Sequence, residues 1–600
     1  MRLLFAYLAL CSLALAQGKS RPSGSEAFES AMNEFMLNSL ALSPVSASAA
    51  GYHLHTDLAS GHIRHLDGEL DDFSPQAIAA QRAFYADWQQ RLRKQFSVSS
   101  LTPEDAADWQ LVDDQISLAL LEFDKIQAYR HNPTNYVETL GNGLFLPLTQ
   151  SYASKAVRVS DVLSRVKQIP RFLEQAKEQL IDADPIFIKV AVEENEGNVS
   201  VIQEDLKEQV GSDEALLAQY NQVAPQAISA LADFSKWMQQ ELARRPNPRS
   251  WRLGNDLYRE KFKYVMETSV TPEEMAASAE REVREVRTQM LELATPMHRE
   301  MYPSHGDHAD LKALERENRI IREVLDKIAD DHVQRGQLLE QVKSDVAGIT
   351  AFIREKKIVA LSERENLKVI PTPEFMRGIF SVAGFRQAPP LEPASEAEYW
   401  VTPIAPGMSD AQAESKLREY NNWVLKWLTI HEALPGHYIQ AEHANNIQPK
   451  TRRLLRSQFA NGAYVEGWAE YIAQVMTDEG FQNRDPRYLL SMKKIRLRVL
   501  TNAILDVRMH TMNMSDDAAV DMMMNLAFQT RAEAEGKLQR AKLSSAQLPT
   551  YYIGLSEWLK LRKQYEARMG PGFSLMEFHN KALSEGALPV PVLGRLILPQ

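Results

Sequence analysis

Apolar residues recur at steps of three and four along much of the chain, the spacing that gathers side chains on one face of an α-helix. A helix start at Thr271, where Glu274 completes a capping box, precedes the clearest stripe. Further helix starts lie at 101–105 and at Ser409. The stripe consists of Met275, Ala279, Val283, Val286, Met290 and Leu293. The chain is therefore predicted to be mainly α.

Strict alternation of polar and apolar residues, typical of β-strands, is scarce, and the best example covers residues 398–402. We interpret it as a small edge strand along which an extended peptide would lie, with Tyr399 among the residues that bind it. The stretch 244–249 contains two prolines and is the best candidate boundary. It divides the mature chain into helical lobes of residues 17–248 and 249–600, which together form one continuous domain.

Composition and charge exclude several classes of protein. With 44% hydrophobic and 24% charged residues, the 600-residue chain has the composition of a globular protein with a large core. Its net charge of −11 provides no electrostatic drive toward nucleic acid. The sequence therefore excludes a disordered chain and a multi-span membrane protein, and it predicts no nucleic-acid partner.

The first residues have the pattern of a secretory signal. Met1-Arg2 starts positive, residues 3–16 are almost all apolar, and Ala14-Leu15-Ala16 is a small-x-small cleavage pattern. The run is too short to span a bilayer comfortably as a helix. We expect a signal peptide of residues 1–16 and an exported mature chain, periplasmic or secreted, without a transmembrane span. The single cysteine, Cys11, lies in this run, so the mature chain would have no thiol chemistry.

Two ionisable residues continue an apolar helical stripe in the C-terminal half. Trp423 and Trp427 lead at steps of four to His431, and Glu432 follows directly. An unpaired charge there would be costly, and His437 lies close by, so we interpret the two histidines as metal ligands. A core histidine held by hydrogen bonds is the alternative for either one alone. A glutamate directly after the first histidine is placed to act as general base on a metal-bound water.

The two histidines are six positions apart, rather than four as in His-Glu-x-x-His. On an ideal helix this spacing rotates the two side chains by about a third of a turn relative to each other. Pro435-Gly436 lies between them, and proline removes a backbone donor while glycine accepts unusual dihedral angles. We therefore predict a helix bulge that brings His437 back toward His431.

A third ligand is available in the helix that follows. Glu466 and Glu470 are four positions apart and share one helix face. We predict that Glu466 completes a His2Glu zinc site and that Glu470 accepts the outer ring N–H of a zinc-bound histidine. A solvated acidic face is the alternative, but Trp468 and Tyr471 leave little of this helix exposed. Zinc suits the ligand set best, and another divalent metal is the alternative.

Two motifs, His-Glu-Ala-Leu-Pro-Gly-His-Tyr-Ile-Gln at 431–440 and Glu-Gly-Trp-Ala-Glu-Tyr at 466–471, resemble those of the bacterial family catalogued as domain of unknown function 885. The resemblance continues through residues 506–511, 549–554, 578–580 and 586–589. That family is grouped with the gluzincin metallopeptidases and is distantly similar to helical peptidases of the angiotensin-converting-enzyme type. The resemblance implies a large, two-lobed helical fold with a deep cleft and zinc held by His431, His437 and Glu466.

A peptide hydrolase also needs a donor for the tetrahedral oxyanion. His510, Tyr551 and Tyr552 are the candidates, since the distant helical peptidases use His and Tyr in this role. The alternatives are a local pair of His510 with Asp506 and core packing for either tyrosine. Arg508 is a candidate for binding a substrate carboxylate, and a surface salt bridge is its alternative.

The sequence therefore predicts an exported zinc metallopeptidase, similar to carboxypeptidases or dipeptidases, whose substrates are short peptides. Glu432 would take a proton from zinc-bound water and return it to the leaving amine. Two alternatives stay open: the same chemistry on a non-peptide amide or ester, and a non-catalytic envelope binding protein with a structural metal site. A structural site needs ligands but no adjacent general base, so Glu432 argues against the last of these.

Overall fold

The computed structural model describes residues 23–57, 60–373, 377, 382–405 and 407–599. The predicted signal peptide, residues 1–16, lies outside the described residues. Within the part that the structure describes, no helix combines the length and apolar character needed to cross a bilayer.

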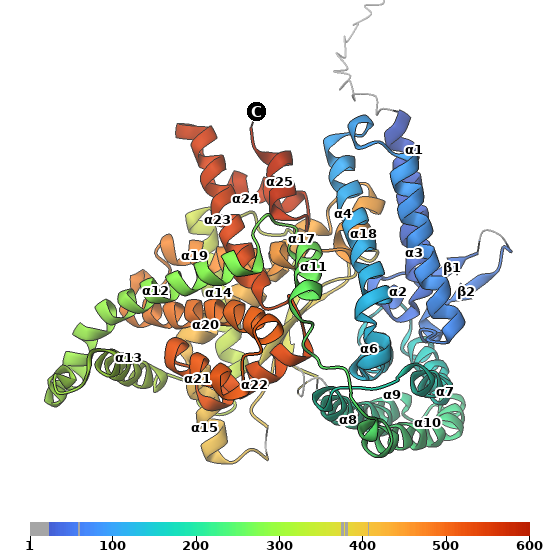
Figure 1. Cartoon of the computed structure of the whole chain (residues 1–600), viewed down its shortest axis with the longest axis horizontal. Helices are drawn as coiled ribbons and strands as arrows, with labels where there is room; N and C mark the ends of the chain where they lie inside the picture. The colour runs from blue at the N-terminus through green and yellow to red at the C-terminus, as the bar shows by residue number, and fades with distance from the viewer. Residues whose placement is uncertain (1–22, 58–59, 374–376, 378–381, 406, 600) are drawn as a thin grey trace, which may run out of the picture.

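The described part of the first half of the chain forms helices and one short hairpin, in which β1 (Leu54–Thr56) pairs antiparallel with β2 (Ile63–His65) (Figure 1). Its helices are α1 (Ser23–Leu42), α2 (Pro44–Ala50), α3 (Pro75–Gln95), α4 (Pro103–Leu121), α5 (Ala128–His131), α6 (Thr134–Thr149), α7 (Lys155–Gln179), α8 (Pro185–Ser200), α9 (Lys207–Val210), α10 (Glu214–Gln240), α11 (Asn255–Met266) and α12 (Pro272–Met301).

The second half adds further helices and a small sheet. Its strands are β3 (Leu367–Pro371), β4 (Ala383–Arg386) and β5 (Ala397–Val401). Its helices are α13 (Ala313–Ala329), α14 (Leu338–Lys356), α15 (Asp410–Glu419), α16 (Asn422–Glu432), α17 (His437–Ala444), α18 (Lys450–Gln458), α19 (Gly462–Asp478), α20 (Pro486–Thr511), α21 (Asp516–Ala527), α22 (Arg531–Leu543), α23 (Pro549–Met569), α24 (Leu575–Ser584) and α25 (Val590–Ile597). The mainly α prediction is confirmed.

The predicted helix starts are confirmed at the level of single hydrogen bonds. Thr271 and Glu274 form the capping box of α12, and Ser409 with Gln412 forms that of α15. The side chain of Thr102 accepts a hydrogen bond from the backbone N–H of Asp105 at the start of α4. These caps satisfy backbone donors that the first helical turn leaves free, so local sequence alone determines where the helices begin.

The predicted edge strand is the central strand of the three-stranded sheet. β5 lies between β3, to which it is parallel, and β4, to which it is antiparallel. Tyr399 is fully buried, and its hydroxyl lies 3.3 Å from that of Thr429. The edge position predicted for Tyr399 is wrong because both sides of its strand are paired. Among the described residues, β3 and β4 are the two edge strands of this sheet, and each pairs only with β5.

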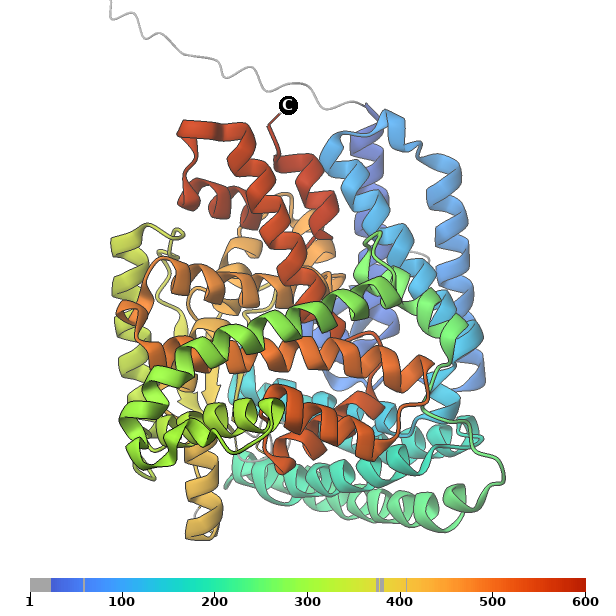
Figure 2. The same cartoon turned by 60° about the vertical axis from the view of Figure 1, so that its left-hand side comes forward.

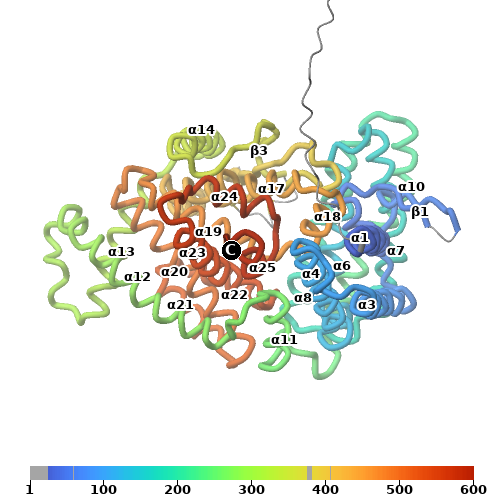
Figure 3. Tube along the Cα trace, turned by 90° about the horizontal axis from the view of Figure 1, so that it is seen from above, coloured from blue at the N-terminus to red at the C-terminus, as the bar shows by residue number. Residues whose placement is uncertain are grey.

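The apolar residues form two main cores. The smaller core unites α6, α7, α8 and α10 and ends at Leu242, just before the predicted boundary at 244–249. The larger core contains the C-terminal half and also residues of α1, α3 and α4, from Phe28 to Ile116. Seen from above, α4 lies beside α25 and α1 beside α18 (Figure 3). The first helices therefore pack with the C-terminal half of the chain.

Buried ion pairs fasten α4 to α18. Arg456 is fully buried, and its Nε donates to Oδ1 of Asp108 at 2.6 Å. Arg452 donates to Oδ2 of Asp108 at 2.7 Å and to Oδ1 of Asp105 at 2.6 Å. Removal of one member of such a pair leaves an uncompensated buried charge, which makes the junction between the two helices specific.

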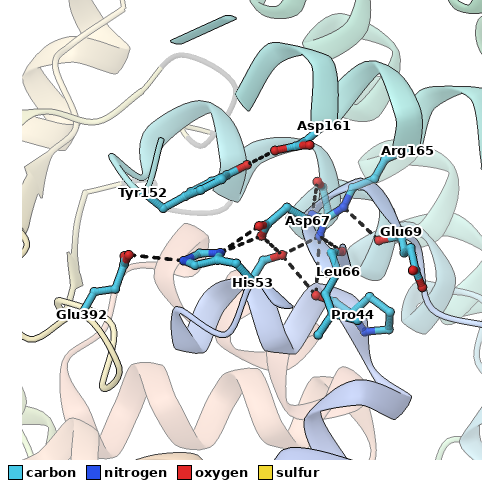
Figure 4. Close-up of polar contacts among 11 residues, drawn as sticks. Pro44, His53, Leu66, Asp67, Glu69, Tyr152, Asp161, Arg165 and Glu392 are labelled. Atoms are coloured by element: carbon cyan, nitrogen blue, oxygen red, sulfur yellow. Dashed lines mark hydrogen bonds and ion pairs between the residues drawn. The ribbon is translucent and has the colours of Figure 1, made fainter. Parts of the chain in front are cut away.

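A second polar network joins the smaller core to the sheet region (Figure 4). Arg165 of α7 is fully buried and donates its Nε–H to the carbonyl oxygen of Glu69 at 2.9 Å. Asp67, two residues before Glu69, places its Oδ2 2.8 Å from Nδ1 of His53. The other ring nitrogen of His53, Nε2, lies 3.3 Å from Oε1 of Glu392. The segment between α2 and α3 thus bridges α7 and the loop that precedes β5.

Candidate metal centre

The segment with the two histidines folds as two helices joined by a tight turn. The helix that starts at Ser409, α15, ends at Glu419, and a new helix, α16, starts after its cap Asn421 and carries His431 near its end. A second break replaces the predicted bulge, since α16 ends at Glu432 and α17 begins at His437. The break nevertheless does what the bulge was expected to do, as the two histidine rings lie 4.8 Å apart, centroid to centroid, at 84°.

Glycine is required in this turn. The N–H of Gly436 donates to the carbonyl oxygen of Ile430 at 2.9 Å, which folds the chain back onto the end of α16. A β-carbon at Gly436 would lie 2.0 Å from the carbonyl oxygen of His431. The indole N–H of Trp468 donates to the carbonyl oxygen of Pro435 at 3.0 Å and thereby fixes the turn to α19. The Pro-Gly pair and Trp468 together place His437.

Helix α19 supplies the third candidate ligand. Oε2 of Glu466 lies 3.5 Å from Nε2 of His431 and 3.7 Å from Nε2 of His437. One ligand atom from each of the three residues lies within 4.8 Å of the other two. Donor atoms bound at about 2.1 Å to one tetrahedral ion stand roughly 3.4 Å apart. The sequence-predicted set of three residues is therefore brought together at distances that suit one metal ion.

One buried oxygen of this cluster, Oε2 of Glu466, is placed to bind a cation, whereas Nδ1 of His431 faces outward, toward Glu470. Oε2 of Glu466 and Nδ1 of His431 are buried, and neither makes a hydrogen bond of normal geometry within the described part of the chain. Oε1 of Glu470, one turn after Glu466, lies 3.6 Å from Nδ1 of His431, on the outer side of the ring. A small movement would complete the carboxylate–histidine contact that orients metal-bound imidazoles.

The electrostatics of the cluster also favour a cation. Burial lowers the pKa of His431, but the carboxylates of Glu466, Glu432 and Glu470 more than offset this and raise that pKa to about 9. Burial raises the pKa of Glu466, but His431 and His437 outweigh it, and the pKa falls to about 2. Three carboxylates thus surround two imidazoles, and a divalent ion would balance the excess negative charge.

The cluster lies in the wall of a cavity of about 1020 Å³. Glu432 lines the same cavity, as do Ala383, Gly384 and Phe385 of β4. Charged residues of α20 and α22 line it as well, namely Arg498, Glu533, Lys537 and Arg540. The cavity is large enough for a small organic molecule or a short peptide segment.

Sequence reasoning missed the contribution of α22. Glu533, Lys537 and Arg540 follow at steps of four and three and share a helix face. Such a pattern is typical of a solvated surface, and only the tertiary structure turns this face toward the metal ligands. Burial, followed by the positive charges of Arg498 and Arg540, lowers the pKa of Lys537 to about 7.

Of the two adjacent tyrosines, only Tyr551 lines the cavity. Its ring lies nearly parallel to that of His431, with the centroids 6.3 Å apart. Its hydroxyl accepts a hydrogen bond from Nη2 of Arg540 at 3.4 Å. Tyr552 packs elsewhere, with its ring 5.3 Å from the guanidinium of Arg496. The structure thus separates two candidates that the sequence left equal.

The other supporting candidates do not line the cavity. His510 is buried, and its Nε2 donates to the carbonyl oxygen of Ser544 at 2.9 Å. Asp506 makes its hydrogen bonds with the hydroxyl of Tyr258 and the backbone N–H of Ala546. The structure therefore places His510 in a structural contact, and its hydrogen-bonding partners are backbone groups, the carbonyl oxygen of Ser544 and the N–H of Leu253.

Arg508 and Tyr399 also lie outside the lining of the cavity. Nη2 of Arg508 is 2.6 Å from Oε1 of Glu280, in a partly exposed ion pair. This is the surface salt bridge that the sequence left as an alternative. Tyr399 lies behind α16, with its hydroxyl next to Thr429, so it has no free edge to offer to a peptide.

Fold and site together define a mainly helical protein with a candidate His2Glu metal centre in the wall of a large cavity. Residues 44–597 match the family described as "Bacterial protein of unknown function (DUF885)", and the chain belongs to this family, as its motifs predicted. A search of curated proteins found no match.

Two solved structures are similar over almost their whole length. A "putative lipoprotein of unknown function" from Shewanella oneidensis is 31% identical, with a TM-score of 0.78 over 95% of this chain and 100% of that chain. A "putative lipoprotein" from Colwellia psychrerythraea is 16% identical, with a TM-score of 0.76 over 96% of this chain and 98% of that chain. The second likeness shows the fold alone.

Proposed function

We propose that the protein is an exported, zinc-dependent hydrolase that cleaves short peptides. One observation carries this proposal: His431, His437 and Glu466 converge on a point in the wall of the same cavity that Glu432 lines. A structural metal site would explain three converging ligands, but it would not explain an adjacent carboxylate that faces an open cavity.

The residues of the chain divide the chemical work. When bound, the metal would polarise a scissile carbonyl and make a neighbouring water more acidic. Glu432 accepts the proton of the attacking water and returns it to the leaving amine. Tyr551 is the side chain best placed to donate a hydrogen bond to the oxyanion, because its ring lies beside that of His431.

The positive wall of the cavity supports a substrate with a free carboxylate. Lys537 and Arg540 of α22 line the cavity together with the candidate metal ligands. A carboxylate bound at Lys537 would favour the charged ammonium, whose pKa is lowered to about 7 by burial and then by the charges of Arg498 and Arg540. This arrangement favours removal of residues from the C-terminal end of a peptide over cleavage in its middle.

The edge strand β4 supports a peptide, rather than another amide or ester, as the substrate. Ala383, Gly384 and Phe385 of β4 line the cavity, and β5 pairs with only one side of that strand. An extended peptide could add its main chain along the other side and direct its carbonyl groups toward the metal centre.

Export is supported from two directions. The apolar run of residues 3–16 has the pattern of a signal peptide. The two solved structures compared above are described as putative lipoproteins, a class that is exported to the cell envelope.

Digestion of a defined peptide mixture, read by mass spectrometry, tests the proposal. The zinc-loaded protein is compared with Glu432→Gln, and the mixture contains each peptide with a free and with an amidated C-terminus. We expect cleavage by the wild type that starts from free C-termini and a loss of about 10²–10⁴-fold in Glu432→Gln. Unchanged zinc content in the variant shows that the loss is one of chemistry. If neither protein cleaves any peptide of the mixture, the proposal of peptide hydrolysis is rejected.

A further inference from the structure

A second group of metal-ligating side chains lies far along the chain from the first, where α12 turns into α13. His298 belongs to the last turns of α12, His305 and His308 to the short helical segment Pro303–His308, and Glu323 to α13. The two helices, green in Figure 2, pack side by side. No residue of this group belongs to the cavity around His431.

The three imidazoles converge on a single atom. Oε2 of Glu323 lies 2.9 Å from Nε2 of His298, 2.9 Å from Nδ1 of His305 and 2.8 Å from Nε2 of His308. One ligand atom from each of the four residues lies within 4.8 Å of the others. Three nitrogen atoms and one oxygen atom gathered in this way form the donor set of a four-coordinate transition-metal site.

A network built only of hydrogen bonds would not need this arrangement. A carboxylate has two oxygen atoms and room for about four donors, which are normally shared between them. Here all three imidazoles approach Oε2, while the contact of Oε1 is a distant one, 4.0 Å from Nη1 of Arg319. Three nitrogen atoms on one oxygen are more than its two lone pairs accommodate, and an ion between the four ligand atoms would replace these crowded contacts.

The backbone between the ligands is strained toward the same point. Gly306, Asp307 and His308 have φ angles of 56°, 52° and 52°. Non-glycine residues adopt this left-handed region rarely and remain in it only where the surrounding structure enforces it. The consecutive left-handed residues make a tight turn, which brings His305 and His308 to the same side as His298.

An outer contact orients the most buried ligand. His298 is fully buried, and its Nδ1 lies 3.3 Å from Oδ1 of Asp307. Nε of Arg299 donates to Oδ2 of the same carboxylate at 2.7 Å and holds it in place. A carboxylate on the outer nitrogen of an imidazole fixes the orientation of the ring and directs the other nitrogen toward a metal.

We propose that His298, His305, His308 and Glu323 bind a divalent first-row transition metal, with zinc as the best fit. Four protein ligands leave no open position, so the site is structural and clamps the hairpin of α12 and α13. The proposal is independent of the catalytic function proposed for the cavity, because the two sites share no residue.

Zinc stoichiometry tests the proposal directly. The full mature chain is dialysed against buffered zinc, and bound metal is measured by elemental mass spectrometry. We expect two equivalents in the wild type, one in the double variant His305→Ala/His308→Ala and one in His431→Ala/His437→Ala. His332→Ala, a histidine paired with Glu414 outside both groups, serves as the control and keeps two equivalents.

Thermal unfolding supplies a second measurement that isolates the new site. In His431→Ala/His437→Ala, added zinc raises Tm, and further replacement of His305 and His308 abolishes this rise. Two outcomes would overturn the proposal: the double variant at 305 and 308 binds as much zinc as the wild type, or zinc leaves the Tm of the 431/437 variant unchanged. If instead the catalytic proposal is wrong, the wild type binds two equivalents of zinc but hydrolyses no peptide.

Discussion

Gly467 of α19 packs directly on Gly554 of α23, and a β-carbon on Gly467 would lie 2.4 Å from the backbone of Gly554. In the other direction, a β-carbon on Gly554 would lie 1.9 Å from the carbonyl oxygen of Ala463. Helix α19 carries Glu466 and α23 carries Tyr551, so this contact sets the distance between a candidate metal ligand and a candidate oxyanion donor.

Replacement of Gly467 by alanine should therefore damage both stability and metal binding. The added methyl group meets backbone atoms, which cannot move aside, and overpacking of this kind costs about 1–3 kcal/mol or more in the free energy of unfolding. Gly197→Ala in α8 is the control, because a β-carbon there meets nothing within 4 Å. Urea unfolding and zinc titration of both variants make the comparison, and equal behaviour would contradict the role of the glycine contact.

The adjacent tyrosines provide a matched pair for the oxyanion role. Tyr551→Phe removes the hydroxyl in the cavity, and loss of one oxyanion donor lowers kcat by about 10²–10³-fold. Tyr552→Phe removes a hydroxyl that does not line the cavity and should leave kcat within twofold of the wild type. Steady-state kinetics on one peptide substrate decides between them. A larger loss in Tyr552→Phe would remove Tyr551 from the mechanism.

Recognition of a free carboxylate by Lys537 is tested in the same way. Lys537→Met removes the ammonium group. A hydrogen bond to a charged group contributes about 1.5–3 kcal/mol, so its loss should raise KM roughly 10–100-fold for peptides with a free C-terminus. The same peptides with amidated C-termini should respond little. Arg508→Met, which breaks only the ion pair with Glu280, should leave KM unchanged. An equal effect on free and amidated peptides would reject carboxylate recognition.

Buried His579 predicts a loss of stability in mild acid. Its Nδ1–H donates to the carbonyl oxygen of Ile358 at 2.7 Å, and its Nε2 accepts from the hydroxyl of Tyr471 at 2.8 Å, so the ring is neutral. Burial lowers its pKa to about 3 from an ordinary value of 6.5. Between these values the unfolded chain binds a proton that the folded chain does not, so the free energy of unfolding falls as the pH falls below 6.5.

The size of this effect is about 1.4 kcal/mol per pH unit from one such group. His579→Asn should be less stable than the wild type at pH 7, because Tyr471 loses its acceptor, yet it should lose less further stability between pH 6.5 and 4.5. Urea unfolding across this range provides the measurement, with the exposed His62→Asn as control. A variant as sensitive to acid as the wild type would show that His579 titrates in the folded state.

Local sequence predicts a large part of this fold. The capping boxes at Thr271 and Ser409 and the apolar stripe of α12 depend only on neighbours in the chain, and all three are confirmed. The same is true of the metal centre to the extent that Pro435-Gly436 requires a turn between the histidines. The prediction of a bulge within one helix was wrong in form, because α16 ends at Glu432 and a new helix, α17, begins at His437.

What the sequence could not predict depends on contacts between distant segments. The sequence pattern of the strand at Tyr399 is the same whether the strand lies at an edge or in the centre of a sheet. Its partners, β3 and β4, come from segments with weak strand patterns. Lys537 and Tyr551 acquire their positions only when α22 packs on α20 and α23 packs on α19. His298 and Glu323 likewise meet only because α12 and α13 form a hairpin.

Because α4 packs against α25, two segments that lie far apart in the sequence have to meet before the larger core can close. Gln110 and Arg595, which share a hydrogen bond of 2.7 Å between these helices, are 485 positions apart. Closing so long a loop costs entropy that only the finished contacts repay, so this step comes late in folding. During synthesis α4 therefore cannot complete its packing until α25 has been made. Removal of α25 should loosen the packing of α4 and of the helices next to it as well.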